Sequence, residues 1–82
     1  MAPPVRRFIE YLRYDEAART QYLTALKLYE RIQEPYSIGY LYLRLSRVAA
    51  TPDDRTRYRE AARAAWLSIG RGDLVERYLA EE

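Results

Sequence analysis

Leu-Tyr-Glu-Arg-Ile-Gln-Glu, residues 28–34, returns in altered form at residues 65–71 as Ala-Trp-Leu-Ser-Ile-Gly-Arg. The aromatic residue and the isoleucine keep their separation across an offset of 37 residues. A second echo, offset by 36 residues, relates Ile38 and Tyr42 to Leu74 and Tyr78. Repeats of this length are typical of a two-helix unit that buries its apolar face only by stacking on a copy of itself.

The composition predicts one small domain over residues 1–82, with 49% apolar and 13% aromatic residues for a thin core. The absence of cysteine excludes a disulfide framework and fits a reducing compartment. No apolar run has the length of a signal peptide, or the roughly 20 residues that a membrane span needs. We therefore expect a soluble, cytoplasmic protein with no membrane association.

The basic residues are almost all arginine, although the net charge is only +2. Lys27 is the single lysine, against 13 arginines, and 12 acidic residues are interspersed among them. One interpretation is solvated helix faces in a protein from a GC-rich genome. The other is that arginine serves for bidentate contacts with carboxylate or phosphate.

Apolar residues recur at helical spacing throughout, and no alternating run predicts a strand. Pro35 should end one helix, Thr51 and Pro52 should begin another, and Gly70 or Gly72 should cap its end. Asp15 is expected to cap the helix that begins at residue 16, and Asp73 begins a capping box for the last helix. The pattern predicts an all-α fold of about five antiparallel helices, at residues 5–13, 16–33, 36–49, 52–69 and 74–81.

The inward-facing positions of these helices predict the core. Its members are Tyr22, Leu26, Tyr29, Leu41, Tyr42, Leu45, Tyr58, Ala62, Trp66 and Ile69.

The segment from Ala18 to Ile69 resembles the tetratricopeptide repeat, a family that alternates antiparallel helices A and B. Ala18, Tyr22 and Ala25 match the small-aromatic-small pattern of its B helix. Leu45-Ser46, preceded by Tyr42, matches the Leu-small pair of its A helix.

One subtype is especially similar. The stretch 28–35, and the ending 64–75, resemble the last repeat and capping helix of arrays in bacterial multidomain signalling ATPases and transcription regulators. The resemblance implies one full repeat over residues 36–69, a partial repeat over 5–34 and a capping helix over 74–81. The 36- or 37-residue spacing departs from the family's 34. Such arrays usually need about three repeats, so the chain is either the end of a longer array or a unit that self-associates.

The residue inventory argues against an enzyme. Histidine and cysteine are both absent, which removes the commonest general base and the strongest common nucleophile. The three glycines form no phosphate-binding loop. Asp53 and Asp54 lack further oxygen ligands at metal-binding spacing. We expect no catalytic residue, metal or cofactor.

A second stripe on the predicted helix 36–49 is the candidate partner-binding site, because the resemblance implies that A helices line a groove that holds a peptide. Its members are Tyr36, Tyr40, Leu43, Arg44 and Arg47. Tyrosine supplies contact area at low entropic cost, and arginine clamps carboxylates. The alternative is that these residues pack against the first helix.

The sequence thus favours a protein-protein interaction module that binds a peptide or helix, or that self-associates. A homodimer is predicted through Phe8, Tyr11 and Leu12 of the first helix, together with the facing stripe of Tyr36, Tyr40 and Leu43. Two alternatives stay open. One is a nucleic-acid-binding helical module, which is disfavoured because the basic residues are scattered among acidic residues. The other is a purely structural cap of a larger signalling protein.

Overall fold

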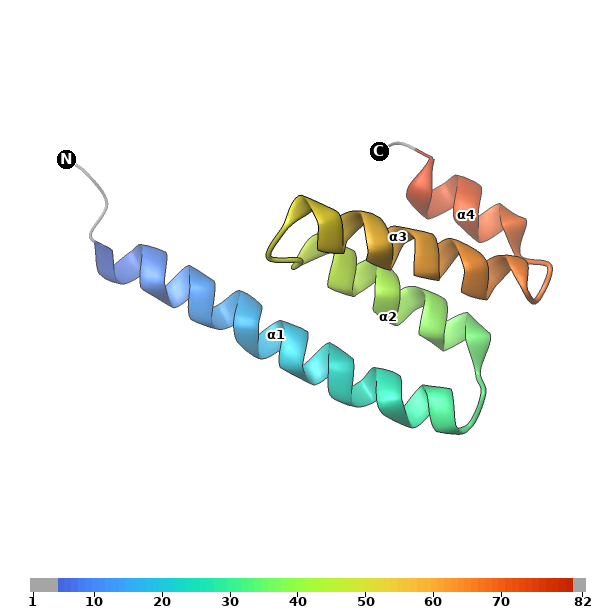
Figure 1. The fold of residues 1–82 in the computed structure, drawn as a ribbon, viewed down its shortest axis with the longest axis horizontal. Helices are drawn as coiled ribbons and strands as arrows, with labels where there is room; N and C mark the ends of the chain where they lie inside the picture. Colours follow the sequence, from blue (N-terminus) through green and yellow to red (C-terminus); the bar gives the residue numbers. More distant parts are fainter. Residues whose placement is uncertain (1–4, 81–82) are drawn as a thin grey trace.

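The computed structural model describes residues 5–80, including the side chains of residues 15–80. Within that range the chain is all-α, as predicted, and contains no strand. The helices are α1 (Val5–Arg31), α2 (Pro35–Arg47), α3 (Pro52–Leu67) and α4 (Gly72–Leu79). Each helix packs on its neighbour in the chain, so that α2 lies between α1 and α3 (Figure 1).

Four helices, not five, occupy residues 5–80, because the predicted helices 5–13 and 16–33 are one continuous helix, α1. Asp15 was expected to cap a new helix, but a cap residue needs non-helical backbone and nothing here interrupts the helix. No glycine or proline lies between Val5 and Glu34. The prediction of a break was therefore wrong, and α1 extends well past the turn between α2 and α3 (Figure 1).

Local capping decides where the other helices begin. The carboxylate of Glu34 accepts a hydrogen bond from the backbone N–H of Ser37 at 2.8 Å, and Thr51 Oγ1 accepts one from Asp54 N at 3.1 Å. Both satisfy backbone donors that the first helical turn leaves free. The predicted capping box of Asp73 is wrong, because that carboxylate is held by two hydrogen bonds from the guanidinium of Arg71, each 3.1 Å long.

Gly70 lies in the turn between α3 and α4 and has a backbone φ of +71°. Glycine adopts this left-handed conformation without strain, so Gly70 is the cap among the two glycines that the sequence left open, and Gly72 begins α4.

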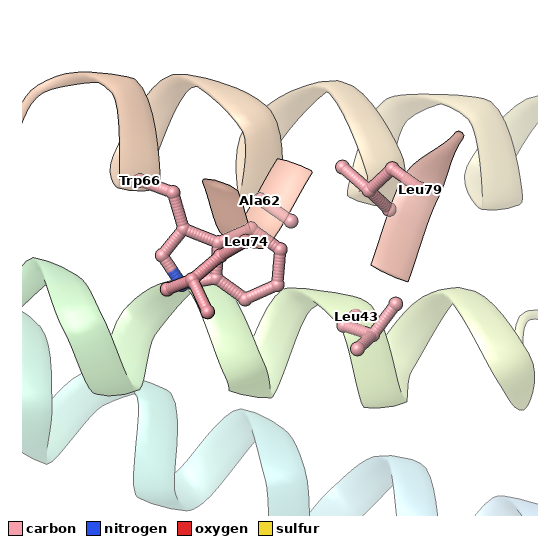
Figure 2. Close-up of a cluster of buried hydrophobic side chains, with 5 residues drawn as sticks. All are labelled: Leu43, Ala62, Trp66, Leu74 and Leu79. Atoms are coloured by element: carbon pink, nitrogen blue, oxygen red, sulfur yellow. The ribbon is translucent and has the colours of Figure 1, made fainter. Parts of the chain in front are cut away.

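The core has two parts. Between α1 and α2, Leu26, Leu41 and Leu45 are buried together. Between α2, α3 and α4 a second cluster is buried (Figure 2), which consists of Leu43, Ala62, Trp66, Leu74 and Leu79.

Most of the predicted core is confirmed, but Ile69 was placed wrongly. Its side chain is 41% exposed, because α3 ends at Leu67 and Ile69 lies in the turn that follows. Four predicted core tyrosines are half-buried at the edge of the α1–α2 cluster: Tyr22, Tyr29, Tyr42 and Tyr58.

Trp66 is fully buried and lies directly against the backbone of α2. Its Nε1–H donates a hydrogen bond to the carbonyl oxygen of Tyr36 at 3.1 Å. Gly39 makes room for the ring, since a Cβ at that position would lie 2.5 Å from Cδ1 of Trp66 and closer still to Nε1 and Cε2. The missing side chain at Gly39 is thus what lets α3 approach α2.

Two arginines close the ends of neighbouring helices. Arg19 on α1 donates to the carbonyl oxygen of Val48 at 2.6 Å, and Arg59 on α3 donates to that of Leu79 at 2.5 Å. Carbonyl groups at a helix C-terminus have no partner within the helix, so a cation there satisfies them and opposes the negative end of the dipole. Structural bonds thus account for part of the arginine content.

None of the helices described over residues 5–80 combines the length and the apolar character that crossing a bilayer requires.

We predict that Gly39→Ala destabilises the protein by about 3 kcal/mol, the upper end of the usual cost of overpacking. The new methyl group would overlap the indole of Trp66, and that ring is enclosed on its other sides. Urea unfolding followed by circular dichroism measures the loss. The control is Gly72→Ala, whose methyl group would meet only Leu67 Cδ2 at an ordinary 3.7 Å, and which should leave stability unchanged or higher.

We predict that stability falls on acidification partly through Glu34. Its hydrogen bonds to Ser37 hold the pKa of this carboxyl below its usual value of 4.5. A lowered folded-state pKa stabilises the fold above the unfolded value, and this contribution is lost as the pH falls through the folded pKa. Glu34→Gln should therefore flatten the dependence of the urea midpoint on pH below about 4.5. The matched control is Glu60→Gln, which replaces a carboxylate at an exposed position of α3.

Candidate functional site

A groove of about 520 Å³ lies open between α1 and α2. Its lining is rich in tyrosine and contains one cation and no carboxylate: Gln21, Tyr22, Ala25 and Tyr29 come from α1, and Ser37, Tyr40, Leu41 and Arg44 from α2. Aromatic area beside a small number of polar groups is the usual composition of a recognition site.

The α1 side of this groove repeats a surface that is completely covered elsewhere in the molecule. At the offset of 37 residues, Ala25 and Tyr29 of α1 correspond to Ala62 and Trp66 of α3. Ala62 and Trp66 are 0% exposed, because both α2 and α4 pack against this face of α3. Ala25 and Tyr29 pack against α2 alone and are half-exposed toward the groove. The corresponding face of α3 is covered by a second helix, whereas no second described helix covers this face of α1, and the groove lies there.

The predicted site residues do not all reach the groove. Tyr40 and Arg44 line it, and the side chain of Arg44 is exposed. Arg47 is exposed one turn farther along α2, outside the lining. Tyr36 is 39% exposed at the start of α2, where the guanidinium of Arg71 lies over its ring at 5.5 Å from the centroid.

Leu43 is a correction to the predicted site. Only 2% of it is exposed, since it packs into the second core cluster with Ala62, Trp66 and Leu79. The stripe that the sequence assigned to a partner is thus divided, because α3, together with α4, packs against this side of α2. Leu43 can bind neither a peptide nor a second copy without unfolding the core.

The predicted dimer residues lie outside the part of the chain whose side chains the structure describes. Phe8, Tyr11 and Leu12 belong to the helical backbone of α1, and their interface stays a prediction.

Tyr40 joins the groove to the core. Its ring contacts Tyr36, Trp66 and Tyr78 edge-on at centroid distances of 5.1, 5.3 and 5.5 Å. Its hydroxyl donates to that of Tyr78 at 3.4 Å. Hydrogen bonding to Tyr78 and then to Tyr36, together with desolvation, raises the pKa of Tyr40 above its usual value. The phenol is therefore neutral at physiological pH, and its orientation is fixed by the core.

Sequence reasoning missed the α1 side of the groove, because it assigned Tyr22 and Tyr29 wholly to the core. The similarity between residues 25–29 and residues 62–66 could have indicated this side of the groove. Ala25 and Tyr29 match Ala62 and Trp66, yet no helix comes before α1 in the described chain to play the part of α2.

The described residues bring together no group of three or more acidic side chains that could hold a metal ion. Comparison of the chain with protein-family models, with curated proteins and with solved structures found no match. The groove between α1 and α2 is therefore assigned as the candidate site from its geometry alone.

We predict that Leu43→Ala costs about 2–5 kcal/mol of stability, as truncation of a buried leucine does. The matched change Leu67→Ala removes the same atoms from a side chain of α3 that is 54% exposed, and should cost less than about 0.5 kcal/mol. Chemical denaturation of the two variants beside the wild type makes the comparison. Equal stabilities would mean that Leu43 belongs to a solvent-facing site after all.

Proposed function

We propose that this chain is a protein-protein interaction module of the tetratricopeptide type, and that the groove between α1 and α2 receives a helix or a peptide from its partner. One observation carries the proposal. The face of α1 that contains Ala25 and Tyr29 is open, whereas the corresponding face of α3 is fully covered by helices.

The chemistry of the lining supports a protein partner. Tyr22, Tyr29 and Tyr40 offer flat, partly apolar surfaces with hydroxyl groups at their edges, which suits apolar and polar groups of a peptide. The small side chain of Ala25 leaves room between them for a large side chain of the partner. Arg44 is the one cation of the lining, and a single cation is a poor basis for binding the repeated phosphates of a nucleic acid.

The repeat architecture supports the family assignment. In the proposal α1 is a B helix, α2 and α3 are a complete A-B pair, and α4 is the capping helix. The antiparallel order of these helices agrees with this scheme. The groove is then the place of the A helix that would precede α1, and a partner helix that fills it would extend the stack by one layer.

We predict that peptides selected from a random library displayed on phage, with the intact chain as bait, bind in this groove. Ala25→Trp should fill the space and Arg44→Glu should reverse its charge. Each should weaken the selected peptides by about tenfold or more, measured by fluorescence anisotropy. Arg47→Glu, an equal charge change on the same helix but outside the lining, should leave the affinity unchanged.

Circular dichroism and the urea midpoint show whether each variant keeps its fold. Peptides that bind equally well to folded Ala25→Trp and Arg44→Glu would show that the groove is not the binding site. If the affinity falls steeply as the salt concentration rises, and Ala25→Trp has no effect, the ligand is bound through charged contacts of the kind made with phosphates.

A further inference from the structure

No other helix within residues 5–80 lies beside the N-terminal half of α1. Arg19 bonds to Val48 at the C-terminal end of α2, so the residues before Arg19 extend past that end. This segment, residues 5–18, is a helix of roughly 20 Å. Such a length matches α2, the helix that covers the corresponding face of α3.

A heptad pattern runs along the open side of α1, with intervals of three and four residues. Its positions are Tyr11, Tyr14, Ala18, Gln21, Ala25 and Leu28. The next position is Ile32, just after the helix ends. Two of these positions line the groove, Gln21 and Ala25. Leu28 and Ile32 are 56% and 60% exposed, the most exposed of the large apolar side chains in the described chain. Such spacing is the pattern by which two helices pair along a seam.

From these observations we infer that a second copy of this chain fills the groove, and that the two α1 helices pair antiparallel about a two-fold axis. The N-terminal half of each α1 then lies in the groove of the other copy. The inference rests on the proposed function of the groove and names its occupant. The direction agrees with the fold, because α2 runs antiparallel to α3 and a two-fold-related α1 runs antiparallel to α1.

The seam complements itself in one register. With the axis between Arg19 and Thr20, position 14 of one copy lies level with position 25 of the other, which pairs a tyrosine with an alanine in the sequence. Position 11 lies level with position 28, where Leu28 is exposed. The register thus pairs large residue types with small or exposed apolar ones, as seam packing requires.

Charge complementarity favours the same register. It places Asp15 of the second copy level with Thr24, and so at the groove that Arg44 lines. Arg44 meets no carboxylate in the groove lining of its own copy. Because of the two-fold axis, the dimer contains this pairing of Asp15 with Arg44 twice.

Sedimentation equilibrium of the intact chain, from about 1 µM to about 1 mM, tests the inference. The wild type should dimerise. Arg44→Glu alone and Asp15→Arg alone should each raise the dissociation constant about tenfold, because like charges then meet at both sites. An equimolar mixture of the two variants should associate as well as the wild type, since both charge pairs are restored. Arg47→Glu is the control and should dimerise like the wild type.

A second measurement places the axis. The chain has no cysteine, so Gln21→Cys takes a single nitroxide label at an exposed position of the seam. In the dimer, labels at this position should lie within about 20 Å of each other, since paired helices are about 8–10 Å apart. Labels at Glu60→Cys, on α3, should be farther apart.

The outcomes separate this inference from the proposed function. A wild type that stays monomeric over the whole range overturns the pairing, while peptide binding in the groove is decided by its own experiment. A dimer that neither charge reversal weakens, or that holds the labels at Gln21→Cys far apart, overturns the register and the seam.

Discussion

The contact between the indole of Trp66 and the bare backbone at Gly39 is the constraint on which the rest of the fold depends. It fixes the distance between α2 and α3, and the hydrogen bond to the carbonyl of Tyr36 fixes the rotation of the ring. Leu43, Leu74 and Leu79 then pack around Trp66, which holds α4 in place. The C-terminal three helices thus form one tightly closed unit around a single large side chain.

The N-terminal side of the molecule is built differently, and this difference creates the site. α1 packs on α2 through leucines and half-buried tyrosines, and no helix closes its other side within the described chain. Tyr29 therefore has one covering helix where its counterpart Trp66 has two. A helix face that no other described helix covers leaves an apolar surface, and a helix or peptide that bound there would stabilise the fold.

Tyr40 connects the two regions, since it lines the groove and also packs edge-on against Trp66. A side chain held by the core keeps its orientation before a partner arrives, which reduces the entropy lost on binding. Arg44, one turn farther along α2, is exposed. The groove thus combines an aromatic side chain held by the core with an exposed cation.

The sequence by itself determined the all-α class, the end of one helix before Pro35, the start of another at Thr51 and Pro52, a glycine turn after α3 and most of the core, because periodicity and capping are local properties. The continuity of α1 was also available locally, since no breaker follows Val5 before Glu34, but the acidic residue Asp15 was taken for a cap. Tertiary structure decided the fate of Leu43 and of the α1 face. Whether an apolar stripe is core or surface depends on which helix folds back over it, and no spacing within α1 or α2 contains that information.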